Sequence, residues 1–507
     1  MKITSLRHIV SLAGFAALLL LLMPAVQAPA TAAVGSAKPT AATLDRYARD
    51  TWASFVAMTD AKTGLPTDRL RDDGTRSRQT STTNIGAYMW SAVAAERLGI
   101  ISHAETVARM SKTISTLERM ERHQPSGQFY NWYDYSTGTK LTTWPPSGAP
   151  LTPILSSVDN GWLATGLRIL RNSVPELASR AEAIYDSMNF GFYYRPDVNR
   201  ILFHYEPDTG KSACCYDTIV SESRIASYIG IAKGELPPKE YYGAWRSFPD
   251  TCDWSWQETR PIGVWRRYLG VDVFEGAYPY AGMRVTPSWG GSMFEALMPS
   301  LFVPEEQWAP RSWGINHPLT IDAHIYHGQH EARYGYWGFS PANVPEVPAG
   351  SVEGDYSAYG VDAIGMDPNG YPSNKDRTLV DHGFSGCPGR PAQPDPSPSA
   401  YTNGVVTPHA VFLALRNRPA ETISNLTKLM QNTRVYTKWG FADSVNVETG
   451  AVSPFYLSLD QGMIMAAIGN ALGDDVLRKA FATPDMKRVL RPVIGIEQFG
   501  ASARPTS

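Results

Sequence analysis

Two kinds of helical segment alternate along most of this 507-residue chain. One kind is apolar on every side, and the other carries a single apolar stripe at helical spacing. A helix that is apolar all round has to be buried, whereas a helix with one stripe packs by that stripe from outside. The apolar segments begin near Ile85, Gly161, Ile219, Gly291, Val405 and Gln461, and the striped segments lie near 42–58, 104–121, 175–189, 238–246, 319–333 and 418–431. The alternation predicts an all-α fold, an (α/α)6 toroid of six outer helices around six inner ones.

A solenoid of stacked helical hairpins is the alternative arrangement. Solenoids repeat with a fixed period, and the apolar segments here are unevenly spaced, so the sequence favours the toroid. The gaps hold long loops rich in glycine, proline and aromatic residues, the longest running from about 335 to 404. We expect a single domain over 41–485 with long loops at its mouth, followed by a C-terminal tail over 486–507.

The N-terminus has the pattern of an export signal. Lys2 and Arg7 precede an almost unbroken apolar run from Ile9 to Met23, and small residues follow. This order is typical of a secretory signal peptide, which we place at 1–33, with a short linker at 34–40. An uncleaved anchor is the alternative, since the run is near the lower length limit for a membrane span. We favour cleavage and a secreted protein with no membrane contact after it.

Export makes disulfide bonds plausible for the four cysteines. These are Cys214, Cys215, Cys252 and Cys387. We expect Cys252 to pair with Cys214 or Cys215, its neighbours in the sequence, and leave Cys387 open. The sequence has no C-x-x-C pair, which disfavours a zinc site.

Charge and motifs exclude several function classes. The chain has 46 basic and 48 acidic residues and a formal net charge of -2, unlike the basic surface of a nucleic-acid-binding protein. It contains no phosphate-binding loop, no dinucleotide fingerprint after a strand and no G-x-S-x-G elbow, so we expect no cofactor. The 25 Tyr, 17 Phe and 14 Trp residues favour a carbohydrate partner only slightly, because aromatic residues also build cores.

Acidic residues lie at or just before the starts of the predicted inner helices. They are Asp159, Asp217, Glu222, Glu295 and Asp460. Parallel inner helices would bring them to one mouth of the toroid. Glycoside hydrolysis needs one carboxylic acid to protonate the leaving oxygen and a second carboxylate as base or nucleophile. N-capping explains the three aspartates equally well when each is taken alone.

The two glutamates are the candidates for the catalytic core. Glu295 has almost only apolar sequence neighbours, which would raise its pKa and suit a general acid. Glu222 falls in a predicted first helical turn, where the helix dipole favours an ionised base or nucleophile. A solvated Glu222, or one paired with Arg224, is the alternative. Asp159 and Asp460 are supporting or alternative catalytic carboxylates.

Four histidines and an acid cluster in one striped segment. The residues are His317, His324, His327, His330 and Glu331. Their order is not H-E-x-x-H, so it does not give metalloprotease geometry. We expect an ordinary surface or cleft role, such as hydrogen bonding to a sugar, and a structural or adventitious metal is the less favoured alternative.

Short motifs recur in order at the expected helix starts. They are Ser81–Gly86, Phe129–Asp134, Ser156–Gly161, Ser221–Arg224, Ser288–Glu295, Trp313–Ile315, Val405–Pro408, Gly440–Asp443 and Leu459–Gly462. Together they resemble the glucoamylase-like domain of six-hairpin glycosidases, a group with bacterial endo-β-1,2-glucanases and the C-terminal domain of cyclic β-1,2-glucan synthases. The resemblance covers roughly 80–475 and implies an (α/α)6 barrel and a carbohydrate-active enzyme.

Within these motifs and at the mouth we also expect residues that bind the glycan. They are Trp132, Tyr133, Asp134, Asn160, Asp217, Arg224, Trp289, Trp313 and Asp443. The sequence departs from the family pattern at two places expected near the mouth. Asn316-His317-Pro318 stands where the family has Ser-Glu-Ser, and Ala296 stands where a Tyr is usual.

The leading hypothesis is a secreted, monomeric glycoside hydrolase acting on β-1,2-glucan or a related polysaccharide. A polysaccharide lyase on the same toroid is a second reading, although the mouth acids disfavour an anionic substrate. A glycan-binding protein without activity is a third. Linkage specificity, endo or exo action and stereochemistry stay open.

Overall fold

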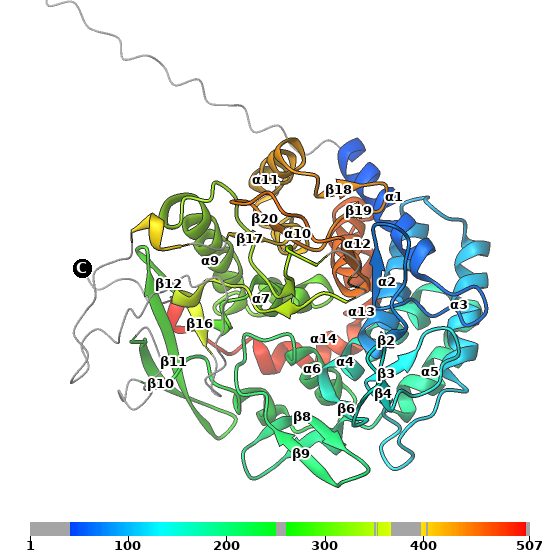
Figure 1. Ribbon diagram of the computed structural model, residues 1–507. Coiled ribbons are helices and arrows are strands. Elements are labelled where there is room, and N and C mark those ends of the chain that lie inside the picture. The colour runs from blue at the N-terminus through cyan, green and yellow to red at the C-terminus, as the bar shows by residue number, and fades with distance from the viewer. Residues whose placement is uncertain are drawn as a thin grey trace, which may run out of the picture. The chain divides into compact units, whose positions relative to one another are not determined.

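The computed structural model describes residues 41–249, 260–348, 351, 353–366, 397–401 and 404–502. Its centre is a closed ring of six helices (Figure 1). These are α2 (Thr82–Arg97), α4 (Ser157–Ser173), α6 (Arg224–Ala232), α7 (Met293–Leu297), α10 (Pro408–Leu413) and α12 (Ser458–Leu472). Each packs on the next from α2 to α6 and from α7 to α12, and α12 packs back on α2. Hydrogen bonds from Arg224 to the carbonyl oxygens of Glu295 and Ala296 join α6 to α7.

The striped segments lie outside this ring. Five of them form α1 (Ala41–Met58), α3 (His103–Leu117), α5 (Ala178–Ser187), α9 (Trp313–Tyr326) and α11 (Pro419–Asn432). They pack on α12 and α2, on α2, on α4, on α7 and on α10, respectively. The sixth, expected near 238–246, is only a 3-10 turn, η3 (Pro238–Tyr242), which contacts α6. The predicted ring of six inner helices is therefore confirmed, and five of the six predicted outer helices surround it.

The inner helices pack closely because their sequences are apolar and small. All residues of α2 from Thr82 to Ala95 are buried. Gly86 of α2 lies against the backbone of α4, where an added Cβ would come 2.4 Å from the carbonyl oxygen of Trp162. A larger side chain at this position would push the two helices apart. The contact explains a glycine in the middle of a buried helix despite its cost in helix propensity.

The fold is not purely all-α, which corrects the sequence-based prediction. A four-stranded sheet joins β6 (Leu155–Ser156), β8 (Arg200–Glu206), β7 (Tyr194–Arg195) and β9 (Lys211–Cys214), and a three-stranded sheet joins β10 (Ile262–Tyr268), β11 (Val271–Tyr280) and β12 (Met283–Val285). The two-stranded pairs are β1 (Arg69–Arg71) with β21 (Phe455–Leu457), β2 (Gln79–Ser81) with β3 (Trp132–Asp134), β4 (Thr143–Trp144) with β5 (Ala149–Pro150), β13 (Ser288–Trp289) with β16 (Gly365–Met366), β14 (Ala342–Asn343) with β15 (Tyr356–Ser357), β17 (Val405–Val406) with β20 (Val445–Asn446), and β18 (Tyr436–Thr437) with β19 (Gly440–Phe441). These strands lie in the connections between the helices.

The predicted end of the domain at 485 is wrong. That position lies inside α14 (Pro484–Ile494), which packs on α6 and buries Met486, Leu490 and Val493. Beyond it, Glu497 is fully buried and forms an ion pair with Arg246. The chain to 502 therefore belongs to the folded unit. Two further short helices are α8 (Glu305–Trp308), which packs on α9, and α13 (Val476–Phe481), which packs on α2, α4 and α12.

Several predictions fall outside the described residues. The signal peptide at 1–33 and the linker at 34–40 are among these and stay predictions, and Cys252 and Cys387 also lie outside the described residues. Among the described residues, no helix combines the length and the apolar character needed to cross a membrane. A disulfide joins Cys214 to Cys215, so the predicted pairing of one of them with Cys252 is wrong.

Candidate active site

Four inner helices carry a polar side chain at the same position, the third residue of the helix. Ser81, Ser156 and Ser292 cap α2, α4 and α7, and each side-chain oxygen accepts a hydrogen bond from the N–H three residues on, at 3.2, 3.2 and 3.4 Å. Those third residues are Asn84, Asp159 and Glu295, and α12 places Asp460 at the equivalent position. The serine satisfies the helix end, which leaves the acidic or amide side chain free for other contacts.

Glu222 and Glu295 meet across α6 and α7. The backbone N–H of Glu222 donates to Oε2 of Glu295 at 2.8 Å, and Nε1 of Trp162 donates to Oε2 of Glu222. Burial and the neighbouring charge of Glu295 raise the pKa of Glu222 well above its usual value. Glu222 therefore keeps its proton to higher pH than an ordinary glutamate and fits a proton donor.

This result reverses the charge state expected for Glu222. Helix α6 begins only at Arg224, so Glu222 lies in the turn before the helix and not in its first turn. The helix dipole is too weak there to offset burial and the negative charge of Glu295. The pair predicted from the sequence is brought together, and Glu222 has the environment of an acid.

Arg224 holds the backbone next to this pair in place. It is 2% exposed, and its guanidinium donates to both carboxylate oxygens of Glu305 at 2.7 and 3.0 Å. It also donates to the carbonyl oxygens of Ser221 and Glu295. Although burial alone would raise it, the charge of Arg224 holds the pKa of Glu305 at about 2. Arg224 is thus a buried positioning residue and not a glycan ligand.

Asp159 lies next to Glu222. It accepts a hydrogen bond from Oγ1 of Thr83 at 2.6 Å, and the amide of Asn131 donates to it at 2.8 Å when its nitrogen is turned toward the carboxylate. Burial raises the pKa of Asp159, and the charge of Asp68 adds to this effect. The charge of Asp159 in turn raises the pKa of Glu222.

Asp68 connects the two halves of the carboxylate ring and was not predicted from the sequence. Its Oδ1 accepts from Nδ2 of Asn84 at 2.8 Å, and its Oδ2 lies 3.2 Å from Nε of Arg69. Its charge acts on both Asp159 and Asp460. Six carboxylates therefore follow one another around the ring of inner helices: Glu295, Glu222, Asp159, Asp68, Asp460 and Asp443.

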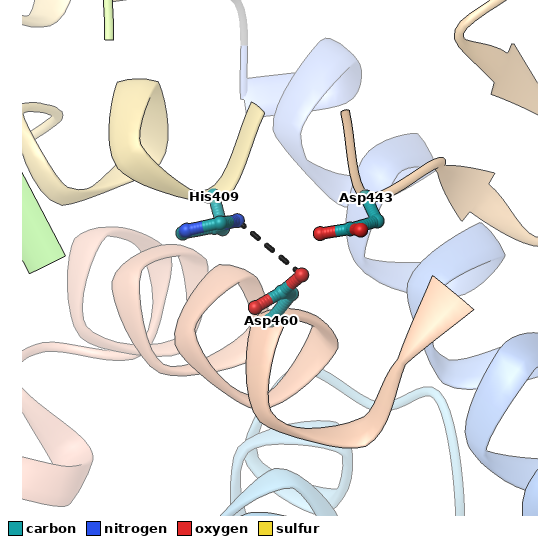
Figure 2. A group of neighbouring side chains, drawn as sticks. All are labelled: His409, Asp443 and Asp460. Atoms are coloured by element: carbon teal, nitrogen blue, oxygen red, sulfur yellow. Dashed lines mark ion pairs between the residues drawn. The ribbon is translucent and has the colours of Figure 1, made fainter. Parts of the chain in front are cut away.

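The last two carboxylates meet a histidine (Figure 2). His409 is the second residue of α10, and its Nδ1 lies 3.4 Å from Oδ2 of Asp460. Asp443 follows β19, and its Oδ2 accepts two hydrogen bonds from Asn343, from the backbone N–H at 2.7 Å and from Nδ2 at 2.9 Å. Burial raises the pKa of Asp460 to about 7 and lowers the pKa of His409 to about 4. Burial and the charge of Asp460 raise the pKa of Asp443 well above its usual value.

Aromatic side chains stand beside the acidic pair. Tyr216 was missed by the sequence reasoning, yet the charges of Glu222, Asp159 and Glu295 all act on its hydroxyl. Its ring packs against Trp289, with centroids 5.6 Å apart, and both are partly exposed. A second pair, Trp132 and Trp144, packs edge to face at 5.1 Å. Partly exposed rings of this kind offer apolar faces for sugar rings to stack on.

Besides Arg224, five predicted glycan-binding residues have structural roles instead. Tyr133 is fully buried and donates its hydroxyl hydrogen to the carbonyl of Glu121. The side chain of Asn160 is buried, where it accepts a hydrogen bond from the backbone N–H of Phe129 and donates one to the carbonyl oxygen of Ser156. Trp313 is fully buried, where its Nε1 donates to the Tyr241 hydroxyl at 3.0 Å.

The two remaining residues of this group are aspartates in ion pairs. Asp134 is 4% exposed and lies 2.6 Å from Nε of Arg78. Asp217 pairs with Arg200, whose guanidinium also covers the ring of Trp245. A short acidic motif looks the same in the sequence whether it contacts a ligand or holds a loop.

The histidine cluster does not lie on a surface or in a cleft, apart from His330. His317, His324 and His327 are at most 2% exposed. His317 approaches Glu305 at 3.2 Å, and His327 bonds Glu331 at 2.6 Å. The sequence expectation for these three residues is wrong, because the helix face that carries them turns inward.

Comparison with known proteins places the chain in a family. Residues 218–484 match the family model described as "Putative glucoamylase". The chain belongs to this glucoamylase family. Residues 46–194 also match the model of a family of unknown function. The chain is 22% identical to the cyclic beta-(1,2)-glucan synthase of Rhizobium meliloti over 86% of its own length, and it spans 18% of the length of that relative.

Solved structures share the fold of this glucoamylase family member. One is an endo-beta-1,2-glucanase from Chitinophaga pinensis, in complex with sophorotriose and glucose. It matches with a TM-score of 0.61 and 17% identity, covering 90% of this chain and 98% of that one. Another is an endo-beta-1,2-glucanase from Talaromyces funiculosus with sophorose, at a TM-score of 0.60 and 13% identity, covering 88% and 90%. The six-hairpin glycosidase fold expected from the sequence is thereby confirmed.

Proposed function

We propose that this protein is a secreted glycoside hydrolase that cleaves a glucan, and that β-1,2-glucan is its substrate. The contact between Glu222 and Glu295 carries the proposal. It places a carboxyl with a raised pKa next to a second carboxylate at the ring of inner helices. Glycoside hydrolysis requires this combination of acid and carboxylate.

In the proposed reaction, Glu222 donates its proton to the glycosidic oxygen as the bond to the leaving sugar breaks. The N–H of Trp162 holds the Glu222 carboxyl in place and stabilises the negative charge that forms on it by donating a hydrogen bond. Glu295, or its neighbouring alternative Asp159, supplies the second carboxylate. This carboxylate either removes a proton from the water that attacks the anomeric carbon, or bonds to that carbon itself to give a glycosyl-enzyme that water then hydrolyses. Tyr216 and Trp289 provide the adjacent apolar faces.

The choice of β-1,2-glucan as substrate rests on the similar proteins, and the two departures from the family motif do not count against it. Ala296 is 1% exposed, and its carbonyl accepts from Arg224. His317 is 2% exposed and contacts Glu305. Both changes lie in the packed layer under the carboxylates, so neither alters a surface that a glycan could touch. They give no reason to depart from the substrate named in the structures of the similar glucanases.

The test is product analysis with β-1,2-glucan, β-1,3-glucan, arabinan and mannan. We expect new reducing ends from β-1,2-glucan and little from the others. An unsaturated product that absorbs ultraviolet light would instead establish a lyase. Binding without any product from the panel would favour the non-catalytic reading.

Export and the monomeric state are part of the same proposal. N-terminal sequencing of protein recovered from the culture medium should find a start within about ten residues of position 33, because signal cleavage follows the small-residue stretch. Light scattering should give the mass of one chain. Retention of residues 1–33 on a membrane-bound protein would contradict the export proposal.

A further inference from the structure

We propose that His409, Asp443 and Asp460 form a binding site for a zinc-type divalent cation. The three side chains come from α10, from the segment between β19 and β20, and from α12, and they point toward one another (Figure 2). One potential ligand atom from each lies within 4.8 Å of the other two. These residues belong to the same ring of carboxylates as the Glu222–Glu295 pair but come from other elements of the chain, and the proposed cation binding does not depend on the proposed hydrolysis.

Four polar atoms of this cluster face only one another among the described residues. Nδ1 of His409, Oδ1 of Asp443 and both carboxylate oxygens of Asp460 are buried without a hydrogen bond within the described ranges. The side chains of His409 and Asp460 are 1% and 2% exposed. Buried polar atoms left without partners are costly, and two carboxylates side by side repel each other unless a cation or a proton lies between them.

The ligand types and their spacing fit zinc. An imidazole nitrogen with two carboxylates is a mixed set that suits Zn²⁺ and related first-row cations better than Ca²⁺ or Mg²⁺, which prefer oxygen alone. Tetrahedral ligands at zinc-bond lengths stand about 3.4 Å apart. Nδ1 of His409 and Oδ2 of Asp460 are separated by 3.4 Å. Three protein ligands leave one coordination position for water or another small ligand.

Asn343 orients the Asp443 carboxylate. Its two hydrogen bonds both go to Oδ2 of Asp443, which leaves Oδ1 of the same carboxylate turned toward the cluster. Metal-binding carboxylates and histidines are regularly oriented by such outer hydrogen bonds. Asn343 lies on β14, so the loop hairpin β14–β15 fixes one ligand of the site.

The experiment uses the full-length mature protein, prepared without a histidine tag and dialysed against a chelator. Titration with ZnCl₂ should show one equivalent bound per chain, with a Kd in the micromolar range or below, and a rise in the melting temperature. Co²⁺ in place of Zn²⁺ should give the visible absorption of a four-coordinate site. Electron spin-echo measurements on the Cu²⁺-loaded protein should detect one imidazole nitrogen.

Single changes at the ligands should remove this binding. We expect Asp460→Asn, Asp443→Asn and His409→Gln each to weaken Zn²⁺ binding by at least ~100-fold, and Asn343→Ala to weaken it by ~10- to 100-fold, the range for outer hydrogen-bonding partners. His327→Gln is the matched control, because His327 is equally buried and pairs with the single carboxylate of Glu331. It should bind Zn²⁺ as the unaltered protein does.

Three results would overturn the proposal. Absence of Zn²⁺ binding at millimolar concentration would mean that the two carboxylates share a proton instead. Unchanged binding in both aspartate variants would place the metal elsewhere. A Cu²⁺ spectrum without imidazole nitrogen, measured on the unaltered protein, would exclude His409 even if its variants fail to fold.

Discussion

Glu222 has two unlike neighbours, and each acts on its proton in a different direction. Glu295 disfavours the charged form of Glu222 by its own negative charge, while the N–H of Trp162 favours it by donating a hydrogen bond. Burial adds to the effect of Glu295, so the net pKa is raised. A general acid works best when its pKa lies near the operating pH, and this balance sets that pKa.

The first prediction concerns the Glu222 carboxyl itself. General acid catalysis typically contributes ~100- to 10,000-fold to a rate. We expect Glu222→Gln to lower kcat on β-1,2-glucan by at least ~100-fold with an unchanged fold by circular dichroism. Glu240→Gln is the matched control, because burial also raises the pKa of Glu240 to about 7, but this residue bonds Ser227 away from the carboxylate ring. Near-normal kcat in Glu222→Gln would remove Glu222 as the acid.

The second prediction follows from the bond between Trp162 and Glu222. Activity should fall as pH rises through the pKa of Glu222, because the acid is then deprotonated. Trp162→Phe removes a donor to the charged form, so it should raise this pKa further and move the alkaline limb of the kcat profile to higher pH. Trp90→Phe serves as control, since Nε1 of Trp90 donates to a backbone carbonyl instead. An alkaline limb that stays in place or moves down would contradict the assignment.

At the scale of the helix, one local turn repeats around the ring. Serine caps the helix, and the third residue projects an acid or amide toward its neighbours, in α2, α4 and α7. The serine matters for both stability and geometry, because it frees the third side chain from capping its own helix. Among the acids predicted at helix starts, this turn positions Asp159 and Glu295. Glu222 precedes α6, and Asp460 lies in α12, whose start has no serine cap.

Ser156→Ala tests this element. Loss of an N-cap serine costs about 1 kcal/mol, and the freed N–H of Asp159 would then compete for its own carboxylate. We expect a lower urea midpoint together with a lower kcat, whereas Ser156→Thr should keep both close to normal. A drop in stability with full activity would show that the cap does not position Asp159.

Other elements could not be predicted from the sequence, for physical reasons. The strands of two or three residues, such as β2 and β3, are too short to show an alternating pattern. Asp68 lies in a loop far from any helix start, and only the tertiary contact with Asn84 brings it to the ring. The sequence predicts that Trp313 binds a sugar, yet its indole is buried and donates a hydrogen bond to the Tyr241 hydroxyl.

At the scale of the folded unit, the C-terminal segment packs into the structure and is not a tail. Arg246 and Glu497 are both fully buried and form an ion pair, and the Tyr241 hydroxyl donates to the same carboxylate at 2.6 Å. This links α14 and its following segment to the turns after α6. The sequence predicts a tail here, because a buried ion pair between residues 251 positions apart leaves no local pattern in it.

Truncation tests this closure. Ending the chain after residue 485 removes most of α14 together with Glu497, and it leaves the Arg246 guanidinium buried without its carboxylate. Removing one partner of a buried ion pair alone costs about 3–5 kcal/mol, and the lost apolar contacts of Leu490 and Val493 add to this. We expect the 485 truncation to be insoluble or to melt far below the full chain, while truncation after 502 keeps the melting temperature. Glu497→Ala in the full chain isolates the ion pair and should lower the free energy of unfolding by about 3–5 kcal/mol. If the 485 truncation melts like the full chain, the domain ends where the sequence had placed it.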